Sequence, residues 1–432
     1  MNSLWTDSLT QPCFPSLDGD KQTDVLIIGG GMAGVLCAYF LERNNVNYIL
    51  VEGERIGHGI TKGTTAVITP QHDTLYSSMI KKHGRETAQL YLEANLNGLS
   101  TYRELAKEID CDFEEMPSVM FSLNDRQKME DETSAIRSLG FDAEFITRTC
   151  MPFSVAGAVR FPHMGQFHPL KFIYGISKNL NIYERTYVKK LDGTVAMTDG
   201  GIIHAKKVIV ATHFPLINKH GMYFMKLYQR RSHVIALENA PHIGCTIEDE
   251  AKNGFYMRNY KNLLLIGGCN HRTGADKGGF TSVREFARTY YPDAVEKYAW
   301  ANQDCVTLDG LPYIGSYSKN MPNVYVASGF NLWGMTTSMV AAFVLCDLVT
   351  EKSNRYAPIF RTDRSMLTGQ LFLNLGTTLM DFVIPTTKRC PHMGCALKWN
   401  PAEHTWDCPC HGSRFDEHGE LIDGPAMKNG DV

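Results

Sequence analysis

The chain lacks two features that would place it on a nucleic acid or across a membrane. Its formal net charge is −3 over 432 residues, so no basic excess is available to neutralise phosphates, and we expect no nucleic-acid partner. It contains no run of about 18 apolar residues, so we expect no transmembrane segment. Residues 366–385 come nearest, but Gln370, Asn374 and Asp381 interrupt them. We interpret this stretch as an amphipathic linker helix that packs on the body of the protein.

The chain also has little that points to an oxidising compartment. Residues 1–21 lack the basic and apolar regions of a secretory signal. Of the twelve cysteines, eight are scattered singly before residue 350 and form no close pair, so we expect them to be reduced thiols. Structural disulfides persist mainly outside the cytoplasm. We therefore expect a cytoplasmic protein.

Two short clusters of cysteine and histidine stand near the C-terminus. Cys390 and His392 form the first, and Cys408 and His411 form the second, with fifteen residues between His392 and Cys408. Two thiolates and two imidazoles are the ligand set of a Rieske [2Fe–2S] centre, and the segment resembles the Rieske signature. A zinc site is the alternative, although zinc more often takes paired C-x2-C and H-x3–5-H spacings. The pattern predicts a protein that transfers electrons.

The Rieske resemblance implies further roles for residues inside these loops. Cys395 and Cys410 match positions that form a disulfide in the cytochrome bc type, with a pair of reduced, buried thiols as the alternative. Ser413 matches a serine whose hydroxyl donates to a cluster sulfur. Phe415 stands where high-potential members carry a tyrosine, so we expect a lower potential here. The final strand of the domain should be absent or very short, because six residues follow Ala426.

A second cofactor signature opens the chain. An apolar strand over residues 24–28 runs into Gly29, Gly31 and Gly34, an apolar helix follows, and a second strand ends at Glu52. Glycines at this spacing permit a tight turn and the close approach of a pyrophosphate to a helix N-terminus. An acid about twenty residues further on is placed to accept a ribose hydroxyl. The unit predicts a bound dinucleotide but does not choose between NAD and FAD.

Further segments resemble the D-amino-acid oxidase family, and this resemblance selects FAD. Residues 55–66 resemble the loop that wraps the FAD phosphates, residues 207–212 resemble the strand that closes the FAD domain, and residues 309–349 resemble the C-terminal FAD motif. In addition to the glycines and Glu52, the resemblance implies contacts with FAD from Arg55, Thr61, Thr64, Thr65, Thr212, Gly329, Gly334, Met335 and Thr336.

The resemblance covers nearly the whole chain, which looks like the bacterial FAD-dependent oxidoreductases of this superfamily that carry a C-terminal Rieske domain. We expect an α/β, Rossmann-like FAD domain over residues 1–350, interleaved with an α+β substrate domain over about 96–185 and 215–300. A linker over 351–385 should lead to a small all-β Rieske domain over 386–432.

The residues that would meet a substrate are less clear. Amino-acid oxidases of this superfamily carry an arginine that grips the substrate carboxylate bidentately, and Asp304 occupies its place here. An acid there would attract an ammonium, although Asp304 could instead cap a turn. Arg258 or Arg272 could supply a carboxylate clamp from the substrate domain. His72 could border the flavin ring or serve as a structural histidine.

We therefore expect an FAD-dependent dehydrogenase that oxidises a C–N bond of an amine or amino-acid-like small molecule. Electrons would pass from the flavin to the Rieske cluster and on to an unidentified one-electron acceptor. One alternative is a reductase in which the cluster receives electrons from a donor and feeds the flavin. Another is a redox-sensing or electron-transfer protein without substrate turnover.

Overall fold

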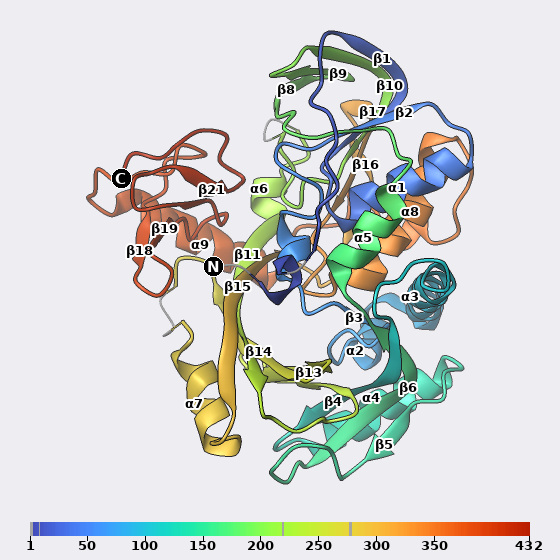
Figure 1. The fold of residues 1–432 in the computed structure, drawn as a ribbon, viewed down its shortest axis with the longest axis vertical. Helices are drawn as coiled ribbons and strands as arrows, with labels where there is room; N and C mark the ends of the chain where they lie inside the picture. The colour runs from blue at the N-terminus through green and yellow to red at the C-terminus, as the bar shows by residue number, and fades with distance from the viewer. Residues whose placement is uncertain (1–2, 8, 218–219, 276–278) are drawn as a thin grey trace.

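A mixed sheet with a parallel centre forms the upper half of the computed structural model, which describes residues 3–7, 9–217, 220–275 and 279–432 (Figure 1). Its order is β16-β17-β10-β1-β2-β7, and β8 and β9 extend it beside β10. The strands are β1 (Lys21–Ile28), β2 (Tyr48–Val51), β7 (Ile182–Tyr183), β8 (Val188–Asp192), β9 (Val195–Thr198), β10 (Ile202–Val210), β16 (Tyr313–Ser318) and β17 (Met321–Ser328).

The central strand β1 is apolar on both faces, as a strand covered on both sides must be. Val25 and Ile27 belong to one buried cluster, and Leu26 and Ile28 belong to another. Helices pack on the first of these faces, and the 3-10 turns lie nearby. They are α1 (Met32–Arg43), α3 (Arg85–Leu105), α5 (Pro169–Ser177), α8 (Gly334–Val349), η1 (Leu4–Thr6), η2 (Ile60–Gly63) and η3 (Ala357–Phe360).

A second, nine-stranded sheet forms the lower half, in the order β15-β11-β14-β13-β12-β4-β6-β3, with β5 beside β6. Helices α2, α4 and α7 flank it (Figure 1). The elements are β3 (Val67–Ile68), α2 (Tyr76–His83), β4 (Glu114–Ser122), α4 (Arg126–Ser138), β5 (Glu144–Ile146), β6 (Gly157–Gln166), β11 (Leu227–Glu238), β12 (Thr246–Asp249), β13 (Phe255–Tyr260), β14 (Leu263–Arg272), α7 (Thr281–Tyr290) and β15 (Val295–Thr307).

The long strands β11 and β15 form a two-sided wall. They pair antiparallel, with Arg231 opposite Gln303 and Arg230 opposite Asp304. Opposed residues of an antiparallel pair share a face, and successive residues alternate between faces. Gln303 and Arg231 therefore point to one side of the wall, and Asp304 points to the other.

A small four-stranded sheet near the C-terminus packs against this wall, at the left of Figure 1. After β21, only a single bridge between Arg389 and Asp431 closes the domain, so the final strand is reduced to one pair. The short helix α6 (Tyr223–Lys226) and the linker helix α9 (Gly369–Val383) lie beside it. The strands are β18 (Lys398–Asn400), β19 (Thr405–Asp407), β20 (Arg414–Phe415) and β21 (Leu421–Asp423).

Two expectations from the sequence are wrong in part. The linker helix forms, but it buries Asn374 and Asp381 and turns most of its apolar side chains outward. Cys150 and Cys245 do form a close pair, with their sulfur atoms 3.2 Å apart as free thiols. Within the described residues, no helix is long and apolar enough to cross a membrane.

Candidate active site and cluster site

The glycines after β1 are required for different structural reasons. Gly29 adopts φ +109°, and a Cβ there would meet Ala211 O at 2.5 Å. A Cβ on Gly34 would lie 1.9 Å from Gly29 O, so both positions are closed by the protein itself. At Gly31, by contrast, a Cβ would meet only Thr61 Oγ1, at 3.5 Å. The space in front of Gly31 is therefore open for a ligand at the N-terminus of α1.

Two side chains hold the loops of this cradle together. One oxygen of Glu52 accepts a hydrogen bond from Gly30 N at 2.7 Å, and the other accepts from Glu54 N at 2.9 Å. Burial raises the pKa of the Glu52 carboxyl. Thr61 Oγ1 accepts from Met32 N at 3.1 Å, at the first turn of α1. Glu52 and Thr61 thus lie beside the glycine loop, as the dinucleotide pattern requires.

The other expected FAD residues gather around the same groove. Thr64, Thr65, Gly334 and Met335 line the cavity described below. Thr336 lies in the first turn of α8, and its hydroxyl donates to Thr69 O. The remaining positions are further from the cavity. Arg55 donates to Gln11, Thr212 donates to Phe214 O, and Gly329 adopts φ +70° against Thr307.

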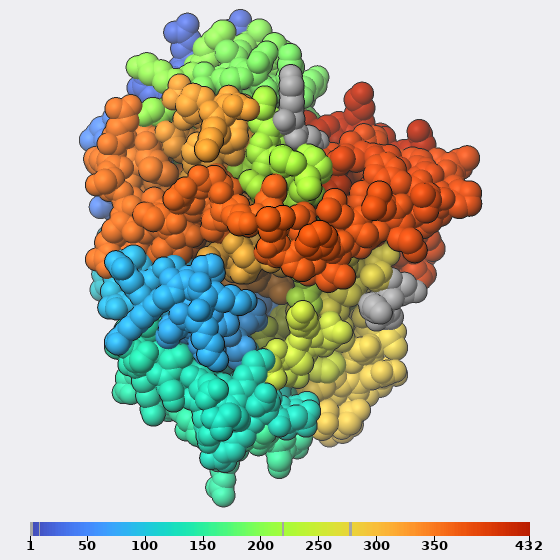
Figure 2. Space-filling view, turned by 180° about the vertical axis from the view of Figure 1, so that it is seen from behind, coloured from blue at the N-terminus to red at the C-terminus, as the bar shows by residue number. Residues whose placement is uncertain are grey.

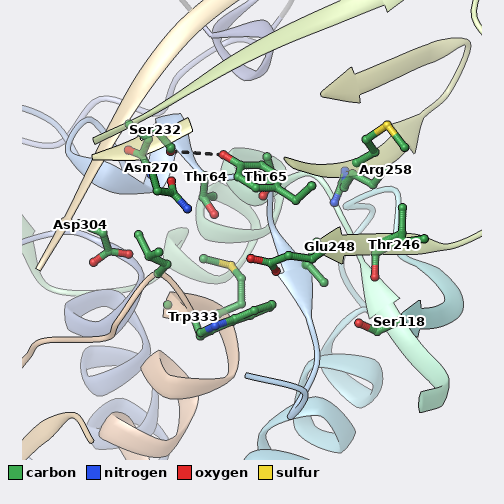
Figure 3. A pocket seen from close by; sticks show the side chains of 18 of the residues that line it. Thr64, Thr65, Ser118, Ser232, Thr246, Glu248, Arg258, Asn270, Asp304 and Trp333 are labelled. Atoms are coloured by element: carbon green, nitrogen blue, oxygen red, sulfur yellow. Dashed lines mark hydrogen bonds between the residues drawn. The ribbon is translucent and has the colours of Figure 1, made fainter. Parts of the chain in front are cut away.

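A cavity lies between the loops expected to bind FAD and the second sheet (Figure 3). The wall strands β11 and β15 border it, and so do β12, β13 and the start of α8. Its polar lining comes from residues far apart in the sequence, namely Ser118, Ser232, Thr246, Glu248, Tyr256, Arg258, Asn270, Asn302 and Asp304.

Two carboxyl groups face this cavity. Asp304 lies within β15 rather than in a turn, and burial raises its pKa to about 7. Burial raises the pKa of Glu248 as well, and among the described residues its carboxylate has no hydrogen-bond or ion-pair partner. In Figure 3, Glu248 lies near the centre above Trp333, with Asp304 to its left. The nearest imidazole to Asp304 is His213, at 4.0 Å, and burial lowers its pKa to about 4, so it is neutral at pH 7.

The two arginines considered as carboxylate clamps differ in where they lie. Arg258 borders the cavity and donates from Nη1 to Ala66 O at 2.9 Å and from Nη2 to Phe167 O at 3.3 Å, while its Nε is buried without a partner among the described residues. Arg272 donates from Nε to Pro409 O at 2.7 Å and from Nη2 to Cys410 O at 3.0 Å. It therefore holds the C-terminal domain and does not reach the cavity.

His72 is buried, and both of its ring nitrogens lie close to protein atoms. Its Nδ1 lies 2.7 Å from the Tyr91 hydroxyl and its Nε2 lies 2.9 Å from Thr69 O. The ring stacks on Trp333 with centroids 5.1 Å apart, and burial lowers its pKa to about 3. Since Nε2 faces a carbonyl, it must carry the proton. His72 thus positions Trp333, which lines the cavity, and does not line it itself.

The four expected cluster ligands meet at one point of the C-terminal domain. Cys390 and Cys408 are buried, and the rings of His392 and His411 lie 4.9 Å apart at 88°. Both ring nitrogens of His392 and Nδ1 of His411 are buried without a hydrogen-bond partner. Buried polar atoms normally have partners, so these nitrogens fit metal ligation. A disulfide joins Cys395 to Cys410, with Cα atoms 6.7 Å apart, and ties the two loops together.

The cluster loops dock on the outer side of the β11–β15 wall. Gln229 donates to His411 O at 2.8 Å, and Gln303 donates to Gly412 O at 2.8 Å. Arg231 forms a buried ion pair with Glu403, which also binds Arg414. Among the contacts of the two histidines, the Phe214 ring meets both His392 and His411 edge-on. The cavity and the cluster site therefore lie on opposite sides of one wall.

Reasoning from the sequence missed Glu248, Gln229 and Gln303. None stands in a motif, because each depends on the face that its strand presents. Alternation in β12 was a usable signal for Glu248. It shares a face with Thr246, whereas Ile247 belongs to a buried apolar cluster.

Comparison with known proteins agrees with this geometry. The family model for FAD dependent oxidoreductase matches residues 24–348, which is most of the chain. The chain belongs to this FAD-dependent oxidoreductase family. A separate model for the Rieske [2Fe-2S] domain matches residues 381–431. The fold class and the two-part family assignment expected from the sequence are thereby confirmed.

Individual relatives show the same combination or part of it. YhfW of Bacillus subtilis, described as a Rieske 2Fe-2S iron-sulfur protein, is 32% identical over 99% of this chain and 96% of its own length. Gamma-glutamylputrescine oxidoreductase of Escherichia coli is 24% identical over 79% of this chain and 87% of its own. The crystal structure of glycine oxidase from Geobacillus kaustophilus superposes with a TM-score of 0.67 at 22% identity, covering 80% of this chain and 99% of that one.

FAD and a [2Fe–2S] cluster are therefore the cofactors of this oxidoreductase. The residues present fit both groups. The open face of Gly31 and the Glu52 carboxylate suit a dinucleotide, and the unpartnered ring nitrogens of His392 and His411 suit a cluster.

Proposed function

We propose that this oxidoreductase is a dehydrogenase that oxidises the C–N bond of a cationic amine. Electrons would pass from the flavin to the Rieske cluster and then to a one-electron acceptor. The observation that carries the proposal is the cavity, in which the carboxyl groups of Glu248 and Asp304 face the open space while Arg258 is bound to backbone carbonyls.

The electrostatics of the cavity favour an ammonium over a carboxylate. A buried carboxylate without a partner is costly, and a bound cation would relieve that cost. Arg230 is the cation that lowers the pKa of Glu248, but it donates to the backbone carbonyls of Lys252 and Asn270 and does not line the cavity. An α-carboxylate would meet two acids, and Nη1 and Nη2 of Arg258 are already bound to backbone carbonyls, so we propose that simple amines bind better than α-amino acids.

The cofactors and the protein would have different roles in this reaction. When bound, FAD accepts a hydride equivalent from a C–H next to nitrogen, and a [2Fe–2S] cluster accepts electrons one at a time. The chain supplies orientation. Glu248 and Asp304 would hold the ammonium, Trp333 would border the substrate, and the β11–β15 wall separates the cavity from His411 by one layer of strands. That short separation supports transfer from the flavin to the cluster.

One relative points to the same substrate class. Gamma-glutamylputrescine oxidoreductase acts, by its name, on an amine derivative, and it matches 79% of this chain. For the compartment we propose the cytoplasm. The eight cysteines outside the cluster loops are all free thiols, including the pair Cys150 and Cys245 at 3.2 Å.

Anaerobic titration tests this function directly. Monoamines and diamines should bleach the flavin absorbance of the purified protein, and the magnetic resonance signal of a reduced Rieske cluster should follow. Neutral α-amino acids of similar size should act at least about tenfold more weakly. Bleaching by amino acids but not by amines would reverse the substrate assignment. If the flavin bleaches while the cluster stays oxidised, the proposed route is wrong.

A further inference from the structure

The linker helix α9 exposes an unusual amount of apolar surface. Of the sixteen large apolar side chains that are exposed within the described part of the chain, eight lie between residues 367 and 383. Soluble monomers rarely expose contiguous apolar patches larger than a few hundred Å². Figure 2 shows the orange-red segment that contains α9 on the surface of the molecule. The eight residues, called the α9 ridge below, are Leu367, Phe372, Leu373, Leu375, Leu379, Met380, Phe382 and Val383.

The orientation of α9 is fixed by polar contacts on its inner side. Asn374 is buried, and its Oδ1 accepts from Arg272 Nη1 at 2.6 Å. Asp381 is buried on the same face two turns further along, and Lys398 lies 3.3 Å from its Oδ1. Leu371 is the buried apolar residue of this inner side. Because these contacts anchor the helix by its polar side, the α9 ridge is held outward rather than left exposed by a loose helix.

The pattern of the ridge is self-complementary about its centre. Gly376 lies at the middle of α9, and a Cβ built there meets nothing within 4 Å, so this side of the helix faces open space. Leu373 and Leu379 lie three residues to either side of Gly376. Phe372 and Met380 lie four residues to either side. In an antiparallel pair of identical helices that cross at Gly376, each of these residues would face its counterpart from the other copy.

We infer that a second copy of this chain covers the α9 ridge, through an antiparallel pairing of the two α9 helices about Gly376. An isologous interface requires the same patch on both subunits, with each residue facing its symmetry partner. Glycine at the crossing point lets two backbones approach closely. Stable homodimers bury about 800 Å² per partner around an apolar centre poor in charge. The ridge supplies such a centre, because residues 365–380 contain no charged side chain.

This pairing would also stabilise the position of the C-terminal domain, because α9 is linked to both cluster loops. Arg272 binds Asn374 of α9 and the carbonyls of Pro409 and Cys410 in the second cluster loop. The end of α9 reaches the first cluster loop, where Arg389 donates to the carbonyls of Asp381 and Gly394. The inference does not depend on the substrate or on the direction of electron flow.

Sedimentation of the full chain with both cofactors tests the pairing. The wild type should have twice the mass of one chain at micromolar concentration. Leu379→Glu should raise the dissociation constant at least about 100-fold, because each dimer buries the substitution twice at its centre. Leu123→Glu, at another exposed leucine (45%), is the matched control and should remain a dimer. Unchanged flavin absorbance and cluster signal would show that the variants are folded.

The antiparallel register has its own test. Combining Leu373→Glu with Leu379→Lys places opposite charges across the proposed axis and should recover at least about tenfold in affinity over either single variant. With Cys13→Ser as background, Gly376→Cys should form a disulfide between copies in oxidised glutathione, whereas Gly369→Cys should not. A monomeric wild type, including one that binds lipid vesicles instead, overturns the inference. A dimer whose dissociation constant is unchanged by Leu379→Glu also overturns the inference. Absence of the disulfide between Gly376→Cys copies overturns the proposed register.

Discussion

Gln303 and Asp304 are neighbours in β15 and point to opposite sides of the sheet. Asp304 lines the cavity, while Gln303 donates to Gly412 O of the second cluster loop at 2.8 Å. Alternation along one strand thus places a candidate substrate residue and a cluster-docking residue back to back. The same alternation in β11 directs Ser232 to the cavity and Arg231 to Glu403.

The open face of Gly31 makes a specific prediction about FAD. Gly31→Val should yield protein with little bound FAD, because the side chain would fill the space in front of the helix N-terminus without meeting the protein. The ratio of flavin to protein absorbance after gel filtration measures this. Gly369→Val is the control, since a Cβ at Gly369 also meets nothing within 4 Å and this residue begins α9, outside the segments expected to bind FAD. Full flavin content in Gly31→Val would disprove the assigned phosphate position.

The cluster assignment predicts the effect of removing one imidazole. His392→Ala should reduce iron and acid-labile sulfide from about two each per chain to a small fraction, because a [2Fe–2S] centre loses one of its four ligands. Elemental analysis of anaerobically prepared protein and magnetic resonance of the reduced state measure this. His418→Ala, at an exposed histidine of the same domain, should keep its iron. Zinc in place of iron in the wild type would contradict the assignment.

Arg272 should control how firmly the cluster loops dock. Arg272→Ala leaves the carbonyls of Pro409 and Cys410 without their donor, whereas Asn374 Oδ1 keeps its hydrogen bond from Gln370. Each stranded acceptor costs about 1–3 kcal/mol. We expect proteolysis of the segment 384–388 to become at least about tenfold faster, with normal FAD content. Arg284→Ala, which breaks an exposed pair with Glu296, is the control and should leave this rate unchanged.

The raised pKa of Asp304 predicts opposite effects of pH on the stability of the fold and on substrate binding. Burial raises its pKa to about 7 from the usual value of 3.8. The folded state therefore holds a proton that the unfolded state has lost between about pH 4 and 7. The stability that this proton contributes is fully present below pH 4 and is lost as pH rises, by about 1.4 kcal/mol per unit across the window. Asp304→Asn should remove this slope in denaturant titrations.

Binding of a cationic amine should show the reverse trend. Ionised Asp304 attracts the ammonium, so kcat/KM should rise as pH increases through about 7. Asp304→Asn should flatten this rise and lower kcat/KM by a factor of about 30 or more, since loss of one buried charge partner costs about 2–5 kcal/mol. FAD and iron contents should stay normal. An unchanged pH profile in Asp304→Asn would remove Asp304 from the substrate site.

The parts of the site that could be predicted from the sequence are those that short local motifs specify. The spacing of Gly29, Gly31 and Gly34 reflects turn geometry over a few residues, and the FAD family assignment followed from it with the later segments. The cysteine and histidine spacings likewise fit one cluster site, and the Rieske assignment is confirmed. The role of Arg258 as a carboxylate clamp stays a prediction, since Arg258 borders the cavity, whereas Arg272 contacts the C-terminal domain instead. These positions depend on how the strands and the C-terminal domain pack, which no local motif specifies.

By itself, the sequence determined which cofactors the chain binds, because those signals lie in short segments whose backbone geometry is set locally. Only the tertiary structure decided which side chains share the cavity and which hold the cluster loops, because strand register assigns each residue to a face. The tertiary structure also decided which side of α9 is buried. An amphipathic pattern favours burial of the apolar side of the helix, but α9 buries Asn374 and Asp381, which bind Arg272 and Lys398, and exposes most of its apolar side chains instead.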